Sequence, residues 1–209
     1  RLLRVFAKPK RIDGFRPDVR SSLLALCVKS HLRPASLVVQ LPPPGIWVVN
    51  GELVDPTRRP WIHPQDRGPL LGDGVFTTIG VKAGRPIWLS PHLDRLAESL
   101  ARVGLPDDVT DWWRQDDRRI EDWIAANDLS GRDAALRLTV TAGPGPRGLD
   151  RPSGVATHWW ASLAATQLGP FLVAPMRAVL AADVPIFSRS RSSGLKTLSR
   201  VDWVLARSV

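Results

Sequence analysis

The chain has 209 residues, of which 44% are hydrophobic and 23% charged, a composition typical of a globular protein rather than a disordered one. A single cysteine, Cys27, excludes a disulfide framework and a cysteine-only zinc site, and the four histidines share no ligand spacing, so we expect no metal site. The net charge of +9 is concentrated at the start of the chain, because residues 1–44 hold nine basic and two acidic residues. The rest is nearly balanced, so it has no broad basic face, and we expect no nucleic-acid partner.

Residues 1–45 are predicted to form a basic leader outside the folded domain. They mix basic residues with prolines, glycines and short apolar runs, and three prolines at 42–44 close the region. The apolar run 21–28 is short and Lys29 follows it at once, which disfavours a secretory signal, so we expect a cytoplasmic protein without a membrane segment. The chain starts on an arginine and its one methionine is Met176, so we expect a processed or incomplete product.

Two hairpins are predicted next in chain order. The first covers 46–54, because Asn50–Gly51 is a strong two-residue turn signal between two apolar runs. A loop with several prolines follows it. Residues 75–81 then predict a strand, and the turn at Ala83–Gly84 should lead to its partner at 86–89.

Residues 90–104 predict the clearest helix, with Ser90 as the N-cap, apolar side chains every three or four positions, and Gly104 after the last turn. Arg95 lies about 140° from the centre of the apolar stripe, so its side chain must face solvent or an anion. A second helix is predicted over 110–127, with its apolar residues on one side.

Three later strands are predicted, at 135–141, 155–165 and 177–187. In the first, alternation sends Leu136, Leu138 and Val140 toward the core and Arg137, Thr139 and Thr141 toward solvent. A serine- and arginine-rich loop over 188–194 and a helix that starts near Ser199 complete the chain.

Residues 143–148, GPGPRG, match a dinucleotide-binding pattern, but their prolines preclude the helix that such a site needs directly after its glycines. We predict instead a constrained loop that presents Arg147. The run SRSRSS at 188–193 is too short to indicate RNA binding, and a solvated loop is the better interpretation.

Four segments carry a family resemblance: WVVNGELVD at 47–55, GDGVFTT at 72–78, HLDRL at 92–96 and GLKTLSRVDWVLAR at 194–207. Their order and spacing resemble the class IV pyridoxal-phosphate enzymes, which include branched-chain and D-amino-acid aminotransferases and 4-amino-4-deoxychorismate lyase. The resemblance implies the α+β fold of that class, like D-amino-acid aminotransferase. A small domain would cover 46–168, and a truncated cofactor-binding domain would start over 169–209.

The resemblance also implies roles for individual residues. Lys196 matches the lysine to which pyridoxal 5'-phosphate is attached, and Arg95 matches the arginine that binds the cofactor phosphate. Arg147 matches an arginine near the substrate carboxylate in parts of the family, and Thr77 and Thr78 fall where substrate is bound. The chemistry is consistent, because an attached lysine must be partly neutral in a sheltered site, and phosphate suits an arginine fork.

The pair Thr77–Thr78 indicates the branch, because the lyases carry F-T-T where branched-chain aminotransferases usually carry F-E-G. The aminotransferases also tend to carry a tyrosine where Val201 stands. We therefore predict a lyase that eliminates pyruvate from 4-amino-4-deoxychorismate to give 4-aminobenzoate, a folate precursor, with Lys196 as the proton-transfer base. The alternatives are a branched-chain or D-amino-acid aminotransferase, and an inactive fragment whose basic leader binds acidic partners.

The resemblance also implies a longer enzyme. Members of the family continue beyond the position of residue 209, and the continuation supplies a glutamate that keeps the pyridine nitrogen of the cofactor protonated. We therefore expect the 209 residues alone to be inactive, and the complete enzyme to be a homodimer that acts on a small-molecule substrate.

Overall fold

The computed structural model describes residues 45–58, 60–154, 156–166, 168 and 191–207. The chain divides into two units, Arg1–Pro42 and Pro43–Val209, and every described residue belongs to the second. The predicted leader and the predicted strand at 177–187 therefore lie outside the described residues.

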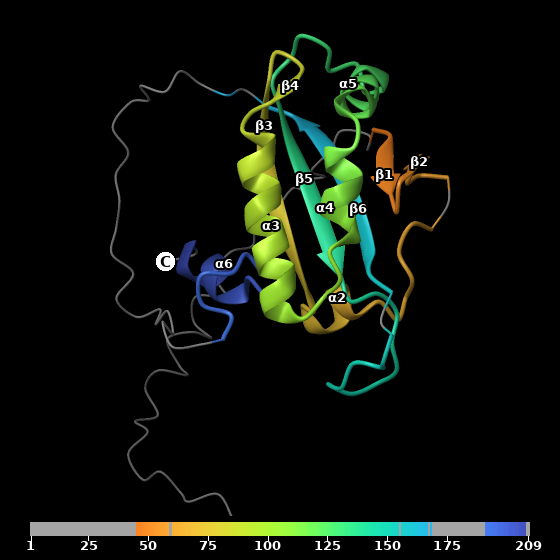
Figure 1. The fold of residues 1–209 in the computed structure, drawn as a ribbon, viewed down its shortest axis with the longest axis vertical. Coiled ribbons are helices and arrows are strands. Elements are labelled where there is room, and N and C mark those ends of the chain that lie inside the picture. Colours follow the sequence, from red (N-terminus) through yellow and green to blue (C-terminus); the bar gives the residue numbers. More distant parts are fainter. Residues whose placement is uncertain (1–44, 59, 155, 167, 169–190, 208–209) are drawn as a thin grey trace, which may run out of the picture. The chain divides into compact units, whose positions relative to one another are not determined.

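A six-stranded sheet with the order β2-β1-β6-β5-β3-β4 forms the centre of the fold (Figure 1), and each neighbouring pair in it is antiparallel. Its strands are β1 (Trp47–Val49), β2 (Glu52–Val54), β3 (Gly74–Lys82), β4 (Arg85–Pro86), β5 (Ala134–Thr141) and β6 (His158–Ala165). The longest pairings join β3 to β5 and β5 to β6, so these three strands are the rigid middle of the sheet.

Both predicted hairpin turns are confirmed. Asn50 and Gly51 have φ angles of 48° and 89°, and Ala83 and Gly84 have 49° and 80°. Positive φ at both central residues gives a turn whose twist matches that of the flanking strands. The return strand of the second hairpin is two residues long, shorter than predicted, because the chain leaves the sheet at Trp88, where φ is 52°.

Helix α3 (Leu89–Val103) follows this exit directly. The prediction that Ser90 is the N-cap is wrong, because the left-handed backbone of Trp88 already turns the chain into the helix, and Trp88 offers no side-chain cap. The predicted end is confirmed: Gly104 has φ of 68°, and its N–H donates to two carbonyl groups of the last turn.

The segment predicted as one helix over 110–127 forms two, α4 (Asp108–Arg114) and α5 (Asp117–Ala126). The single-helix prediction is wrong because Asp116 starts a second helix, as Asp107 starts the first. Asp107 accepts a hydrogen bond from the N–H three residues on at 3.3 Å, and Asp116 accepts one from the N–H two residues on at 3.0 Å. Such side chains satisfy the N–H groups that a helix start leaves unbonded, and so favour a break at that point.

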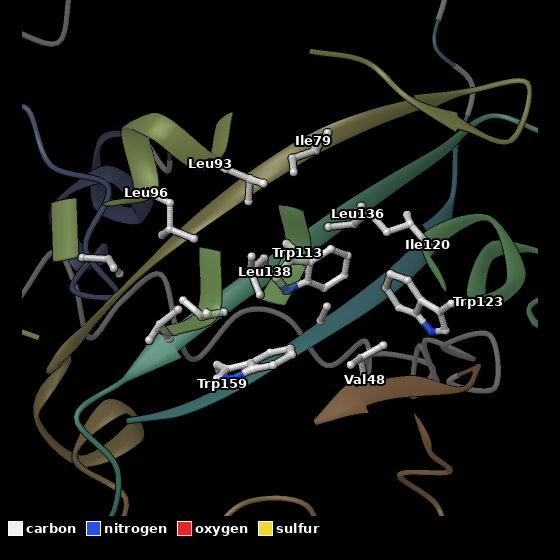
Figure 2. Close-up of a cluster of buried hydrophobic side chains, with 14 of the residues drawn as sticks. Val48, Ile79, Leu93, Leu96, Trp113, Ile120, Trp123, Leu136, Leu138 and Trp159 are labelled. Atoms are coloured by element: carbon white, nitrogen blue, oxygen red, sulfur yellow. The ribbon is translucent and has the colours of Figure 1, made fainter. Parts of the chain in front are cut away.

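The core lies between one face of the sheet and helices α3, α4 and α5 (Figures 1 and 2). The four apolar residues predicted for the second helix are all buried: Trp113, Ile120, Trp123 and Ile124. The rings of Trp113 and Trp123 meet edge to face with centroids 5.8 Å apart, and Trp159 of β6 lies 6.2 Å from Trp113. This packing holds α4 and α5 against β6.

The alternation on β5 is confirmed for Leu136, Leu138 and Val140, which are buried, and for Arg137, which is exposed. It is wrong for Thr139 and Thr141, which were expected to face solvent and are 1% and 0% exposed. Thr139 is paired between Phe76 of β3 and Trp160 of β6, whose large rings share its face. Thr141 donates its hydroxyl proton to the buried carboxylate of Asp66 at 3.0 Å.

Asp66 caps a short helix, α2 (Arg67–Leu71), where the sequence predicted a loop. Its carboxylate accepts from the Gly68 N–H at 2.8 Å and lies 3.0 Å from Nδ1 of His158. Burial raises the pKa of Asp66, but hydrogen bonds from His158, Gly68 and Thr141 outweigh it, and the pKa is lowered overall. The charged carboxylate therefore joins α2 to the ends of β5 and β6.

The sequence analysis expects neither a membrane segment nor a metal site. None of the described helices is long and apolar enough to cross a bilayer. Within the same residues there is no group of three or more side chains suited to bind a metal ion.

Thr139 carries a stability prediction, because its buried hydroxyl has no hydrogen-bond partner among the described residues. Thr139→Val removes this unsatisfied group and keeps the side-chain shape, so we expect the free energy of unfolding to rise by about 1 kcal/mol. Thr110→Val is the matched control, because Thr110 is equally buried but donates to Asp107 at 2.7 Å, and it should lose about 1 kcal/mol. Urea denaturation measures both, and an equal loss in the two variants would contradict the prediction.

Candidate active site

The segment 196–198 lies along the open edge of β3, because β4 pairs only with the far end of that strand. The Phe76 N–H donates to the Lys196 carbonyl oxygen at 2.9 Å, and the Leu198 N–H donates to that of Gly74 at 3.0 Å. A Cβ at Gly74 would lie 2.9 Å from Cδ1 of Leu198 and would clash with the backbone of β5. Glycine at this point of the GDGVFTT segment therefore lets β3 lie close to β5 and leaves room for the Leu198 side chain.

Several cations gather around the ring of Phe76. Cζ of Arg137 lies 3.8 Å from the ring centroid, Nζ of Lys196 5.1 Å, and Cζ of Arg200 5.4 Å. Contacts of this kind are favourable because the ring face carries negative charge. No ion pair between these three side chains and a carboxylate occurs among the residues that the structure describes. The group therefore carries unbalanced positive charge and is suited to bind an anion.

The pKa of Lys196 is lowered from its ordinary value. Burial is the largest cause, and the positive charges of Arg95, Arg200 and Arg137 add to it. Burial and Arg200 lower the pKa of Arg137 as well. A lysine in such surroundings reaches its neutral, nucleophilic form at a lower pH than a solvated one, which agrees with the expected sheltered site.

Arg95 is exposed on α3, and this confirms the expectation that it faces solvent or an anion. One terminal nitrogen of its guanidinium, Nη2, lies 3.3 Å from Oγ1 of Thr77 and 3.1 Å from Nδ1 of His92. Because its charge also lowers the pKa of Lys196, Arg95 and Lys196 belong to one electrostatic environment, and their roles toward the cofactor stay a prediction.

The two predicted substrate-binding threonines lie on opposite faces of β3, because successive strand residues alternate. Thr78 pairs with Arg137 across the β3–β5 ladder, on the face that carries Phe76. Thr77 is 1% exposed on the helix side, where its hydroxyl contacts Arg95 and His92. A substrate contact therefore stays a prediction for both, and Thr78 is the one that shares a face with the cations.

The predicted loop at 143–148 is confirmed, since no helix follows it. Its start is held by the Arg67 N–H, which donates to the Gly143 carbonyl oxygen at 2.9 Å. Arg147 is exposed, and no described contact joins it to Lys196. Its predicted role at the substrate carboxylate thus stays a prediction.

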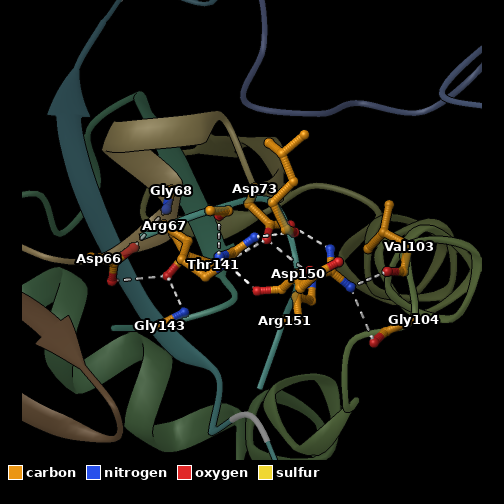
Figure 3. Close-up of polar contacts among 12 residues, drawn as sticks. Asp66, Arg67, Gly68, Asp73, Val103, Gly104, Thr141, Gly143, Asp150 and Arg151 are labelled. Carbon is orange, nitrogen blue, oxygen red and sulfur yellow. Dashed lines mark hydrogen bonds and ion pairs between the residues drawn. The ribbon is translucent and has the colours of Figure 1, made fainter. Parts of the chain in front are cut away.

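A buried ionic network that the sequence analysis missed ties this loop to the start of β3 (Figure 3). Arg67, which is 3% exposed, donates from Nε to Asp73 at 2.8 Å. From Nη1 and Nη2 it donates to the carbonyl groups of residues 148–150 at 2.8 to 3.3 Å. Arg151 binds both carboxylate oxygens of Asp73 and reaches the carbonyl oxygen of Val103 at the end of α3. Asp73 stands between two glycines of GDGVFTT, so the network fixes the segment that carries Phe76 and the threonines.

A cleft of about 460 Å³ lies beside the cation group, which consists of Arg137, Lys196 and Arg200 around Phe76. It is bounded by α2 and by the segment that leads into helix α6 (Val201–Arg207), and its lining includes Leu71, Gly72, Trp160 and Arg200. Arg200 belongs to both the cleft and the cation group, whereas Lys196 does not line the cleft. The positive charge of Arg200 therefore faces a space that could take part of a small molecule.

Residues 74–208, more than half of the chain, match the family Amino-transferase class IV. The chain belongs to this family. The match spans β3, α3, Arg95 and Lys196, so it includes the residues assembled above. Class IV aminotransferases are pyridoxal-phosphate-dependent enzymes, and the expectation of that family is confirmed.

Three relatives show how far the similarity extends. The chain is 33% identical over 96 residues to a bifunctional aminodeoxychorismate lyase / D-amino acid transaminase of Mycobacterium tuberculosis, covering 46% of the chain and 32% of that protein. It is 35% identical over 102 residues to a putative branched-chain-amino-acid aminotransferase of Methanocaldococcus jannaschii, covering 49% and 34%. The crystal structure of 4-amino-4-deoxychorismate lyase from Pseudomonas aeruginosa is 29% identical with a TM-score of 0.53, covering 78% of the chain and 56% of the lyase. The class IV α+β fold is thereby confirmed, and the chain matches about a third of the length of its curated relatives.

Proposed function

We propose that the whole protein carrying this chain is a pyridoxal-phosphate-dependent lyase that eliminates pyruvate from 4-amino-4-deoxychorismate to give 4-aminobenzoate. The observation that carries the proposal is the group of three cations around Phe76, which form no ion pair with a carboxylate among the described residues. One of the three is Lys196, whose pKa is lowered, and Thr78 lies on the same face of the sheet. The proposed substrate carries two carboxylates, and arginines that pair with no carboxylate in the described part of the chain are chemically suited to it.

The residues present fit the cofactor as a chemical group. A phosphate needs a fixed arginine fork, and the Arg95 guanidinium has two neutral neighbours and no carboxylate paired with it among the described residues. A carbonyl needs an amine that is partly neutral, and the pKa of Lys196 is lowered. Bound here, pyridoxal phosphate would supply an electron sink for the negative charge that develops on the substrate.

The remaining steps belong to side chains of the chain itself. Lys196 would move the proton at the reacting carbon, because burial and three arginines make its neutral form accessible. Arg137 and Arg200 would bind and orient substrate carboxylates, because both guanidinium groups lie at the Phe76 ring. Thr78 lies on the same face as Arg137 and would contact the substrate beside it.

The choice of the lyase rests on Thr77–Thr78 and on Val201 in place of a tyrosine. The similarity to the Pseudomonas aeruginosa lyase over 78% of the chain supports it. A branched-chain or D-amino-acid aminotransferase remains the second candidate, because the names of the two curated relatives include those activities. An inactive fragment with a basic leader is the candidate of another class.

We further propose that 46–168 is a small domain and 169–209 the start of the cofactor-binding domain, within a cytoplasmic homodimer. The basis is the family resemblance, together with the cations that 196–200 brings to the edge of β3. A loop that presents Arg147 to substrate is part of the same proposal.

Two assays on one preparation test the function. A coupled assay follows pyruvate released from 4-amino-4-deoxychorismate, and a second assay follows amino transfer from leucine, glutamate or D-alanine to a keto acid. We expect pyruvate release to be the faster reaction. Dominant transamination would replace the lyase by the second candidate, and absence of both reactions in the whole protein would favour the inactive fragment.

A further inference from the structure

We infer that Thr77 and His92 are positioning residues that orient the Arg95 guanidinium for the cofactor phosphate, and that protonation of His92 releases this orientation. The inference rests on the proposed function, because that proposal assigns the cofactor phosphate to Arg95. It goes further by giving two side chains a role and by making phosphate binding depend on pH.

The contacts converge on one nitrogen. Nη2 of Arg95 lies 3.1 Å from Nδ1 of His92 and 3.3 Å from Oγ1 of Thr77, and the two acceptor atoms lie 3.2 Å apart. Thr77 is buried in the middle strand β3, and His92 precedes Arg95 by one turn of α3, so both acceptors are fixed by regular structure. An exposed arginine must otherwise be ordered when it binds a ligand, and these contacts order it beforehand.

The geometry also determines the tautomer of His92. A guanidinium only donates hydrogen bonds, so Nδ1 of His92 must accept the bond from Arg95 and carries no proton. The single ring proton then resides on Nε2. Thr77 contributes a second acceptor, Oγ1, to the same guanidinium nitrogen.

Protonation of His92 would remove this arrangement, because Nδ1–H would face an N–H of Arg95. The charged groups that face His92 are Arg95 from its own helix and Lys196 from the segment beside β3, while β3 itself presents the neutral Thr77 hydroxyl. Burial, then the charges of Arg95 and Lys196, lower the pKa of His92 below its ordinary value. His92 thus stays neutral at neutral pH, and orientation of Arg95 is lost only as the pH falls through that lowered pKa.

The first experiment reads the imidazole directly and needs no cofactor. Nitrogen-15 chemical shifts of the histidine rings are followed from pH 8 to pH 5 in the whole protein, with His92→Asn identifying the signal. We expect Nδ1 of His92 to be the unprotonated nitrogen and Arg95→Met to raise the His92 pKa. A proton on Nδ1, or a pKa that Arg95→Met leaves unchanged, would overturn the inference.

The second experiment separates the phosphate from the rest of the cofactor by comparing dissociation constants of pyridoxal phosphate and pyridoxal. Because hydrogen bonds to charged groups are the stronger ones, His92→Phe and Thr77→Val should each weaken pyridoxal phosphate binding about tenfold and leave pyridoxal binding unchanged. His92→Asn and Thr77→Ser keep an acceptor and should restore most of the affinity. Ser99→Ala is the matched control, because Ser99 donates to the backbone carbonyl of Arg95 and not to its guanidinium.

The pH dependence of cofactor binding distinguishes a titrating His92 from a hydrogen-bond acceptor that does not titrate. On acidification the preference for pyridoxal phosphate over pyridoxal should fall more steeply in the unmodified protein than in His92→Asn, which cannot titrate there. Equal slopes, or equal losses for both ligands in His92→Phe and Thr77→Val, would overturn the inference while the proposed function stands. If Arg95→Met binds pyridoxal phosphate as tightly as the unmodified protein, the assignment of the phosphate to Arg95 fails, and the inference fails with it.

Discussion

Lys196→Ala is expected to abolish the covalent attachment of pyridoxal phosphate and to reduce pyruvate release to background. The reason is that Lys196 combines a lowered pKa with a fixed place at the edge of β3, where Phe76 donates to its carbonyl oxygen at 2.9 Å. Borohydride reduction followed by peptide mass spectrometry measures the attachment. In the unmodified protein the added mass should lie on Lys196, and in the alanine variant no peptide should carry it.

Lys82→Ala is the matched control for this experiment. Lys82 is the other lysine in the described part of the chain, and it is exposed and paired with Asp133 at 2.7 Å at the far end of β3. That variant should keep both the added mass and the activity. The assignment of Lys196 is wrong if the alanine variant still forms a reducible linkage, or if the label in the unmodified protein lies on Lys82.

The fold was predictable where local periodicity determines structure. The hairpin turn at Asn50–Gly51 and helix α3 depend on residues close in sequence, and both are present. Predictions failed where distant residues decide, and at one helix break where a local capping signal was missed. Thr139 was expected to face solvent because it alternates with core residues, but Phe76 and Trp160 cover it from neighbouring strands. The break between α4 and α5 depends on Asp116, a local capping signal that the apolar periodicity obscured.

The site was predictable only in part, for the same reason. Lys196 and Arg95 are predicted from the resemblance alone. Arg137 was expected only to face outward, because its place beside Phe76 follows from the register of β3 against β5. His92 could have been found, since residues three apart share a face of a helix and His92 stands three residues before Arg95. The ionic partners of Asp73 stand up to 78 residues away in the sequence, and no local sequence pattern indicates them.

Asp73→Asn is expected to destabilise the fold strongly. Asp73 is 12% exposed and Arg67 3%, so removing the carboxylate charge leaves a buried guanidinium without its ionic partner. Breaking a buried pair from one side costs about 3 kcal/mol or more, whereas the neutral amide can replace only part of the hydrogen bonding. Urea denaturation at pH 7 measures the loss in the free energy of unfolding.

Asp94→Asn is the matched control, because Asp94 pairs with Arg114 at 2.7 Å on the surface, with the two side chains 62% and 41% exposed. Solvent screens such a pair, so the same substitution should cost less than about 1 kcal/mol. Similar losses in the two variants would show that burial does not strengthen the Asp73 network.

The pH dependence of stability gives an independent measure of the same network. Burial raises the pKa of Asp73, but hydrogen bonds and charge from Arg151 and Arg67 outweigh it, so the pKa in the folded protein is lowered. The stabilisation by Asp73 is therefore fully present above the carboxyl pKa of the unfolded chain, about 4, and is lost as the pH falls through the lower folded value.

Asp66 contributes an acid-dependent loss of stability of its own in both proteins. The difference in the free energy of unfolding between the unmodified protein and Asp73→Asn therefore isolates the network. That difference should be constant from pH 7 to pH 5 and shrink below pH 4, and a difference that grows on acidification would reverse the assigned direction of the Asp73 pKa.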